Sequence, residues 1–542
     1  MVGMLWHTPE ALEELLCEVV GWESRTFSQG EKDFPVKLQE KLKLLPYFKE
    51  HRDYVHLHDA DKGRRSLTAV YRHPDADVTK TIVMISHFDT VQTEEYGHLE
   101  PFAFDPKALT MKLKEEAETL PEAARADLDS DNYLFGRGTM DMKMGVVLHL
   151  HIIEQAIEEG WPLNIVLVSV PDEEVDSVGM RTVVPELLKL KETHALDYTL
   201  FLNSEPSFTQ RPGDETHYIY TGTMGKIMPA VLFYGKETHV GEPLSGITAT
   251  YMSSYVSKDM EWNPAFREED LGESTPLPVS LQLRDLKLEY STQTPYRAAA
   301  LYNVFTMKRD AGEVMDTFEE VVTKAMQQCS ADYERLCARE QVEGVGGVRV
   351  IRYEELYEYV KNKFDEDLID EGTRTILQEE DWDDREQAIR LAGEWMLLCP
   401  ELAPAAVLFF APPYYPAVNS SDESLIQEAV ESLKQTADDE GFRVEHVHYF
   451  NGICDLSYVN YQKPDSELDA YPNNTPVWGT GYTIPFEAMQ QLKAPVLNVG
   501  PFGKDPHQRT ERLHRQNAFV HTPKMLHKLM EVWQKNSSPH YS

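Results

Sequence analysis

The stretch FGRGTMDMKMG at residues 135–145 decides how the rest of the chain is interpreted. It is rich in glycine and precedes an apolar run, residues 146–157, whose pattern predicts a helix with a buried face. Such a loop either cradles an anion at the helix N-terminus or lets the backbone approach a ligand closely. It lacks the spacing of a phosphate-binding loop, and a carboxylate, Asp141, stands at its centre. We interpret Asp141 as a bridge between two metal ions; a purely structural loop is the alternative when this stretch is taken alone.

The composition favours a globular protein of several domains. Its 542 residues are too many for one core, which predicts two or three domains. The formal net charge of −39, from 52 Lys+Arg against 91 Asp+Glu, disfavours nucleic-acid and anionic-membrane partners. The five cysteines are scattered without zinc-finger spacing, and no apolar run reaches about 18 residues. We therefore expect a cytoplasmic protein without a membrane segment.

Four apolar segments predict buried strands, at residues 66–71, 81–86, 163–170 and 198–203. Helical patterns alternate with these strands, which predicts an α/β fold with a mostly parallel, helix-flanked sheet. Ligands commonly gather at the carboxyl ends of the strands in such sheets. The residues that directly follow each strand are therefore the first candidates for a functional site.

His87 and Asp89 come directly after the strand predicted at residues 81–86. Residues i and i+2 of an extended segment point the same way, so both side chains can enter one pocket. Asp89 then orients the imidazole of His87 while the other ring nitrogen binds a metal ion. A strand-end histidine held by a nearby aspartate is an equally good interpretation of this pair by itself.

Carboxylates follow two further strands. Glu173 and Glu174 come after residues 163–170, and Glu205 comes after residues 198–203. Most Glu-Glu pairs in so acidic a chain are solvated helix faces, but this pair terminates an apolar strand. A late apolar segment, VLNVG, is followed by a second histidine. The candidates are thus His87, Asp141, Glu173, Glu174, Glu205 and His507.

This set of side chains suits a site with two metal ions. Histidines combined with carboxylates suit zinc, and cobalt or manganese accept the same ligands. Five ligands hold two ions about 3.5–4 Å apart if one carboxylate bridges them. One acid then remains free, and hydrolysis at such a site needs an acid to take the proton of a water molecule.

The sequence pattern changes after Glu205. Residues 217–223 and 226–234 alternate as the two strands of a hairpin do, and the following segments predict a small α+β domain. The pattern of buried strands resumes near residue 405. We therefore predict a catalytic domain whose first part is residues 1–216 and whose second part is residues 402–542, with an inserted lid or dimerisation domain at residues 217–401.

Five segments resemble the signature segments of one metallopeptidase family: SHFDTV, GRGTMDMKMG, PDEEVDSVG, SEP and GPFGKDPHQRTER. This is the dizinc family of aminoacylase, acetylornithine deacetylase, succinyl-diaminopimelate desuccinylase and carboxypeptidase G. GKETHVGEPLSG resembles the lid motif of that family. The long lid, the total length and the wording of the motifs are most similar to the branch of the arginine-utilisation protein RocB.

The resemblance implies a role for each candidate at the metal centre. Asp141 would bridge two Zn²⁺ ions, and the peptide bond after it would be cis. His87 and Glu205 would complete one ion, and the remaining pair, Glu174 and His507, would complete the other. Glu173 would act as the general base, and Asp89 would support His87.

The resemblance also implies residues outside the metal centre. His239 in the lid would polarise the oxyanion, typically from the partner subunit of a homodimer. Asp455 would be structural. Arg297, Asn303 and Arg309 are candidates for contact with the substrate.

The expected function is hydrolysis of an amide-type C–N bond in a small amino-acid derivative. The substrate would be an N-acyl or ureido compound, with the RocB resemblance favouring the arginine, ornithine and citrulline group. Dipeptidase or aminopeptidase action is the alternative within the family. A catalytically silent binding or sensor protein is the alternative of a different class, and it is disfavoured because neither a ligand nor the base is missing.

Overall fold

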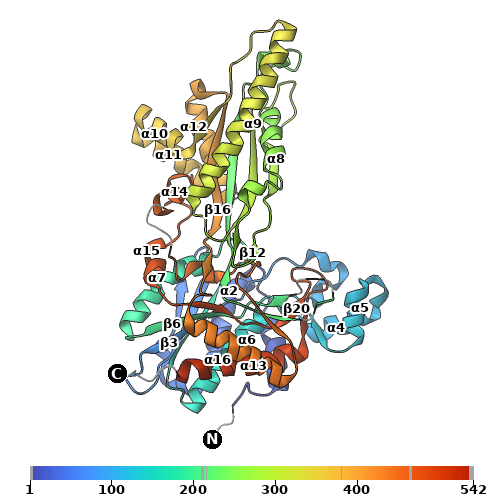
Figure 1. The fold of residues 1–542 in the computed structure, drawn as a ribbon, viewed down its shortest axis with the longest axis vertical. Helices are drawn as coiled ribbons and strands as arrows, with labels where there is room; N and C mark the ends of the chain where they lie inside the picture. Colours follow the sequence, from blue (N-terminus) through green and yellow to red (C-terminus); the bar gives the residue numbers. More distant parts are fainter. Residues whose placement is uncertain are drawn as a thin grey trace. The chain divides into compact units, whose positions relative to one another are not determined.

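The computed structural model describes residues 4–208, 211, 213–214, 216–287, 289–379, 381–462 and 467–535. The chain forms two compact units. The first contains Met1–Thr223, Val418–Tyr461 and Pro485–Ser542, and the second contains Met224–Ala417 and Gln462–Ile484. Each unit has its own large sheet with helices packed on it (Figure 1).

The first unit is built on an eight-stranded sheet. Its strands, in spatial order, are β1 (Val55–Asp59), β2 (Arg65–Tyr71), β5 (Asn164–Val170), β3 (Lys80–His87), β6 (Asp197–Asn203), β19 (Val496–Asn498), β8 (His217–Tyr220) and β18 (Val444–Val447). β3 pairs in parallel with both β5 and β6, and β6 pairs in parallel with β19. The predicted α/β fold with a mostly parallel, helix-flanked catalytic sheet is confirmed.

Helix α6 (Lys143–Glu159) explains why the residues after the glycine-rich loop are so apolar. It packs against β3 and β5 on one side and against α1 (Pro9–Val20) and α16 (Thr522–Lys535) on the other. Nearly all of its side chains are therefore buried. Thr8 caps the N-terminus of α1 with its hydroxyl, as a Thr-Pro start favours. Helices α2 (Gln29–Leu42), α7 (Val178–Thr193) and α13 (Ser424–Glu440) also pack against strands of this sheet.

A second, four-stranded sheet lies in the same unit. Its order is β4 (Tyr133–Phe135), β21 (Arg512–His514), β20 (Phe502–Lys504) and β7 (Ser207–Phe208). Three distant segments of the chain are thereby joined: the one before the glycine-rich loop, the one around residue 507 and the one after Glu205. Before the glycine-rich loop the chain forms α4 (Pro106–Glu115) and α5 (Glu122–Asp129).

The second unit is the inserted α+β domain that the sequence predicts. Its sheet has the order β13 (Val279–Asp285), β14 (Arg297–Thr306), β10 (Gly225–Tyr234), β16 (Ala405–Tyr415) and β15 (Arg349–Arg352). Helix α8 (Ala249–Met260) and the long helix α9 (Ala311–Glu340) pack on one another and on this sheet (Figure 1). Helices α10 (Tyr353–Lys363), α11 (Glu366–Leu377) and α12 (Asp384–Leu398) follow.

The predicted hairpin of residues 217–223 with residues 226–234 is wrong. β8 pairs with β18 and β19 in the sheet of the first unit, whereas β10 pairs with β14 and β16 in the second. Alternation identifies a strand but not its partner, and the chain passes from one unit to the other between Thr223 and Met224. The units also differ from the expected domain ranges: residues 217–223 belong to the first unit, and residues 402–417 and 462–484 belong to the second. No helix of the described residues is long and apolar enough to cross a membrane.

Candidate metal centre

The ends of two neighbouring strands, β3 and β6, bring His87 and Glu205 together. His87 is the last residue of β3, and its neighbour in the register of β5 is Val170. Glu205 lies two residues beyond the end of β6. Because β3 pairs in parallel with both strands, all three carboxyl ends meet at one edge of the sheet, as expected for a ligand site in an α/β fold.

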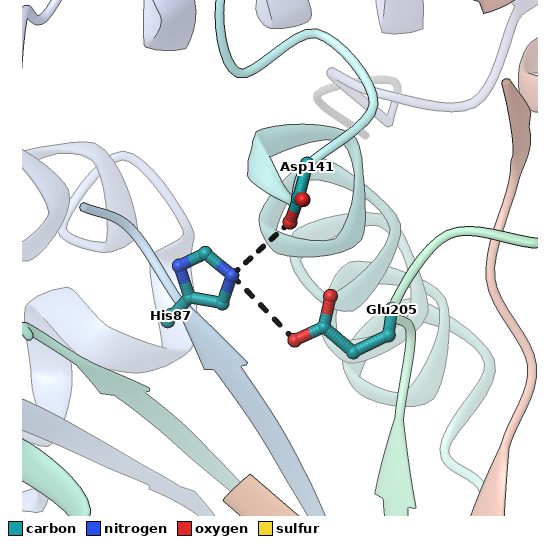
Figure 2. A group of neighbouring side chains, drawn as sticks. All are labelled: His87, Asp141 and Glu205. Atoms are coloured by element: carbon teal, nitrogen blue, oxygen red, sulfur yellow. Dashed lines mark ion pairs between the residues drawn. The ribbon is translucent and has the colours of Figure 1, made fainter. Parts of the chain in front are cut away.

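Figure 2 shows how Asp141 joins this edge from the loop that begins α6. Nε2 of His87 lies 3.4 Å from Oδ1 of Asp141 and 3.5 Å from Oε1 of Glu205. These three ligand atoms lie within 4.8 Å of one another, which is close enough for one metal ion. The Asp141–Met142 peptide bond is cis, as the resemblance implies.

The other oxygen of Asp141 belongs to a second group. Nε2 of His507 lies 3.0 Å from Oδ2 of Asp141 and 3.2 Å from Oε2 of Glu174. This group also fits within 4.8 Å. The small sheet explains the arrangement, because its strands β4, β20 and β21 place the loop of Asp141 beside the loop of His507. The described residues therefore form two groups of candidate ligands that share one carboxylate.

Two atoms of the first group show that the site fits a cation. Nε2 of His87 and Oε1 of Glu205 are buried and make no hydrogen bond within the described part of the chain. A buried polar atom without a partner carries a desolvation cost, which a metal ion bound to it removes. The donor set of imidazole nitrogens and carboxylate oxygens is one that zinc, cobalt and manganese accept.

The electrostatics of the site support the same conclusion. Burial lowers the pKa of His87, but the carboxylates of Glu205 and Glu173 outweigh it and hold this pKa well above the usual histidine value. Burial likewise opposes the charged form of His507, yet Asp141 and Glu174 raise its pKa to about 12. The carboxylates thus stabilise positive charge strongly, which suits a cation; a metal ion bound here would take the place of a proton on each ring.

Glu173 lies at the centre but outside both groups. Its Oε2 atom is 3.8 Å from Nε2 of His87. Burial raises the pKa of Glu173 well above its usual value, and Glu205 adds to the rise although His87 opposes it. Nearby metal cations favour the ionised form of such a carboxyl, which can then accept a proton.

Asp89 lies next to His87, where the sequence predicts it, but its carboxylate has further partners. Nδ1 of His87 is 3.1 Å from the backbone oxygen of Asp89 and 3.5 Å from the carboxylate. The carboxylate accepts hydrogen bonds from the backbone N–H groups of Glu173 (3.0 Å) and Glu174 (3.3 Å) and from the hydroxyl of Thr26 (2.9 Å). Asp89 therefore holds the Glu-Glu segment as well as the histidine.

The candidates from the inserted segment lie in the second unit. His239 is exposed, and its Nδ1 atom accepts a hydrogen bond from the N–H of Gly241 at 3.1 Å. Arg297 and Asn303 lie on β14, and Arg309 donates to the carbonyl oxygen of Ala265. Their roles toward the centre stay predictions. Asp455 lies in the first unit, buried at the start of a short 3₁₀ helix, Asp455–Tyr458.

Several buried residues around the centre were not predicted from the sequence. Nζ of Lys143 donates to the carbonyl oxygens of Val20 and Trp22 at the end of α1, and Arg137 forms a buried ion pair with Glu511 at 3.0 Å. These three charged residues stand within the signature segments, so their position was visible although their contacts were not. Thr26 lies outside the signature segments, and its partner Asp89 is 63 residues away, so nothing in the local sequence marks this contact.

Comparison with known proteins supplies further information. Residues 83–475 of the chain match the protein family described as Peptidase family M20/M25/M40. YqjN, an uncharacterized protein of Bacillus subtilis (strain 168), is 40% identical over 535 residues, 96% of this chain and 96% of its own. Protein RocB of the same organism is 29% identical over 538 residues, 95% of this chain and 94% of its own. Succinyl-diaminopimelate desuccinylase of Helicobacter hepaticus is 23% identical over 265 residues, 47% of this chain and 59% of its own.

Solved structures show the same fold. A tripeptidase from Staphylococcus aureus superposes with a TM-score of 0.54 at 12% identity, covering 98% of this chain and 100% of its own. The aminopeptidase PepT from Bacillus cereus superposes with a TM-score of 0.53 at 13% identity, covering 98% of this chain and 99% of its own. At these identities the likeness concerns the fold alone.

Proposed function

Since the chain belongs to Peptidase family M20/M25/M40, we propose that it uses two zinc ions to hydrolyse an amide-type C–N bond of a small amino-acid derivative. Membership of the family makes it a metal-dependent hydrolase of amide or peptide bonds. The observation that carries the two-ion proposal is the position of Asp141. Its Oδ1 faces His87 at 3.4 Å and its Oδ2 faces His507 at 3.0 Å, which is how a bridging carboxylate is placed.

We assign the ligands by these contacts. Asp141, His87 and Glu205 would hold one ion; Asp141, Glu174 and His507 would hold the other. When bound, the pair of ions supplies an acidified water and a polarised substrate carbonyl. Zinc is the proposed metal because its preferred ligands are nitrogen and oxygen donors of this kind, and cobalt or manganese would substitute.

Glu173 would be the general base. It belongs to neither ligand group, and its Oε2 atom lies 3.8 Å from Nε2 of His87. In the proposed reaction this carboxylate takes a proton from the attacking water and then gives it to the departing nitrogen. Asp89 keeps the base in place by accepting the backbone N–H of Glu173.

The second unit would act as the lid, and His239 would stabilise the oxyanion from a partner subunit. Since Nδ1 of His239 accepts a hydrogen bond, the proton of the neutral ring is on Nε2, where it can be donated to the substrate. We place the homodimer contact at β13, one of the two edge strands of the lid sheet. Leu281 and Leu283 on this strand are 52% and 48% exposed, and an open, apolar edge favours pairing with another chain.

The proposed substrates are N-acyl or ureido compounds of the arginine, ornithine and citrulline group, which would place the enzyme in arginine metabolism. Support comes from the similarity to RocB, which extends over 95% of this chain, and from the resemblance of the signature segments to that branch. The excess of acidic residues suits the cationic side chains of arginine and ornithine derivatives within this group.

A hydrolysis screen tests this proposal. Zinc- or cobalt-loaded protein is incubated with derivatives of arginine, ornithine and citrulline, with other N-acyl amino acids and with dipeptides, and the release of amine is followed. The proposal predicts release from an N-acyl or ureido compound, loss of activity with a chelator and recovery with metal. Release from dipeptides alone would instead identify a dipeptidase, and no release from any class would contradict the proposed reaction.

A further inference from the structure

Three ionisable side chains lie buried beside the Glu-Glu segment and take no part in the proposed reaction. Arg64 is 3% exposed, and Glu31 and Asp172 are 0% exposed. Removing charges from water costs several kcal/mol per ion, so such a group is retained only when its contacts compensate for that cost. Asp172 directly precedes the proposed base, so the contacts of Asp172 bear on the position of that base.

Arg64 holds these carboxylates together. Its guanidinium donates to Oδ1 of Asp172 and lies 3.5 Å from Oε1 of Glu31. On its more exposed side it contacts Oδ1 of Asp61 at 2.6 Å. The guanidinium also lies over the ring of Phe27, 4.9 Å from its centroid. A planar guanidinium with several fixed donors suits this arrangement, because it can bind several oxygens at once in one orientation.

Asp172 shapes the turn that carries the Glu-Glu pair. Its φ angle is +70°, a conformation that costs a non-glycine residue free energy unless the surroundings hold it. Its Oδ2 atom accepts the backbone N–H of Val178 at 3.1 Å, and its carbonyl oxygen accepts the N–H of Ser177 at 2.6 Å. The side chain of Asp172 is therefore fixed between Arg64 and the beginning of α7.

The residues after Asp172 are held from the other side. The N–H groups of Glu173 and Glu174 donate to the two carboxylate oxygens of Asp89, at 3.0 and 3.3 Å. We infer that Arg64 is a positioning residue for the reaction: through Asp172 it fixes the backbone from which Glu173 reaches the centre. This inference rests on the proposed role of Glu173 as the base.

The substitution Asp172→Asn tests this inference. Asparagine tolerates the same backbone conformation and still offers an oxygen to Val178, but it loses the charge that pairs with Arg64. We expect kcat for the best compound of the screen to fall about 10-fold to 100-fold with KM unchanged, because small displacements of a catalytic group have effects of this size. The control is Asp61→Asn, which removes another partner of the same guanidinium without touching the turn, and it should keep the wild-type kcat.

A measurement without substrate or metal makes the test independent of the proposed reaction. Amide hydrogen exchange over residues 173–178 should become about tenfold faster in Asp172→Asn, since a hydrogen bond to a charged group contributes about that factor. Asp61→Asn should exchange like the wild type. Wild-type exchange in Asp172→Asn, or equally fast exchange in Asp61→Asn, would overturn the inference.

The kcat measurement and the hydrogen-exchange measurement together distinguish a failure of the proposed function from a failure of this inference. If the wild-type protein hydrolyses no compound of the screen, the proposed function fails, and the exchange data still decide the role of Arg64. If the wild type is active and Asp172→Asn retains the wild-type kcat, the inference fails alone. Should Asp172→Asn not fold, Arg64→Lys is measured in its place. Lysine keeps the charge but lacks the planar fork, so slower turnover and faster exchange are expected, and wild-type values of either quantity would overturn the inference.

Discussion

Replacing Glu173 with glutamine separates proton transfer from metal binding at the proposed centre. Glutamine has nearly the same size but cannot take a proton from water. General bases contribute about 10²–10⁴-fold to a rate, which corresponds to roughly 2.7–5.4 kcal/mol in the activation free energy. Glu173 belongs to neither ligand group, so Glu173→Gln should retain both metal ions. We therefore expect kcat to fall about 100-fold to 10,000-fold while the metal content stays at the wild-type value.

The assay measures kcat on the best compound of the screen together with metal ions per chain by mass spectrometry. Glu174→Gln is the matched control, because it makes the same chemical change at the glutamate that directly follows Glu173. Its Oε2 atom lies 3.2 Å from His507 in the second ligand group, so this variant should lose metal. The reasoning is refuted if Glu173→Gln loses a metal ion and Glu174→Gln does not, since the base and the ligand would then be exchanged.

Three further predictions concern other parts of the molecule. His239→Ala should lower kcat without changing metal content; mixing it with Glu173→Gln should restore activity if His239 acts across a dimer, and no restoration in mixed dimers would exclude that role. Thr26→Val removes the hydroxyl that donates to Asp89 at 2.9 Å, and it should lower the free energy of unfolding by about 1.5–3 kcal/mol in urea titrations, whereas Thr26→Ser should remain close to wild type. Burial lowers the pKa of His149 to about 3, so the unfolded chain binds a proton at this residue below pH 6.5 while the folded protein does not. Unfolding free energy should therefore decrease between pH 7 and pH 5 by about 2 kcal/mol more in the wild type than in His149→Gln, and equal pH dependence of the two proteins would show that His149 does not contribute.

The fold could be predicted where local pattern determines it. The segments at residues 81–86 and 163–170 are continuous in apolar residues because both faces of a central parallel strand are buried, and they form β3 and β5. The hairpin could not be predicted correctly, because pairing depends on which unit each strand enters. β8 and β10 lie close together in sequence but belong to different sheets.

The site could be predicted in part for the same reason. His87 and Glu205 follow strands, so their meeting at one edge of the sheet follows from the fold class. The contact between Asp141 and His507 depends on the small sheet that joins β4 to β21, which local pattern does not reveal; only the resemblance to the family supplied it. Arg64 was missed entirely, because its contact with Asp172 spans 108 residues and no local spacing marks it.

Metal content tests the central claim most directly, because the account depends on one carboxylate shared by two ions. Protein dialysed against buffered zinc would be analysed by mass spectrometry for zinc per chain, in the wild type and in Asp141→Ala. The account predicts two ions in the wild type and loss of both in the variant, since Asp141 faces His87 with one oxygen and His507 with the other. One ion or none in the wild type, or two ions in Asp141→Ala, would contradict it.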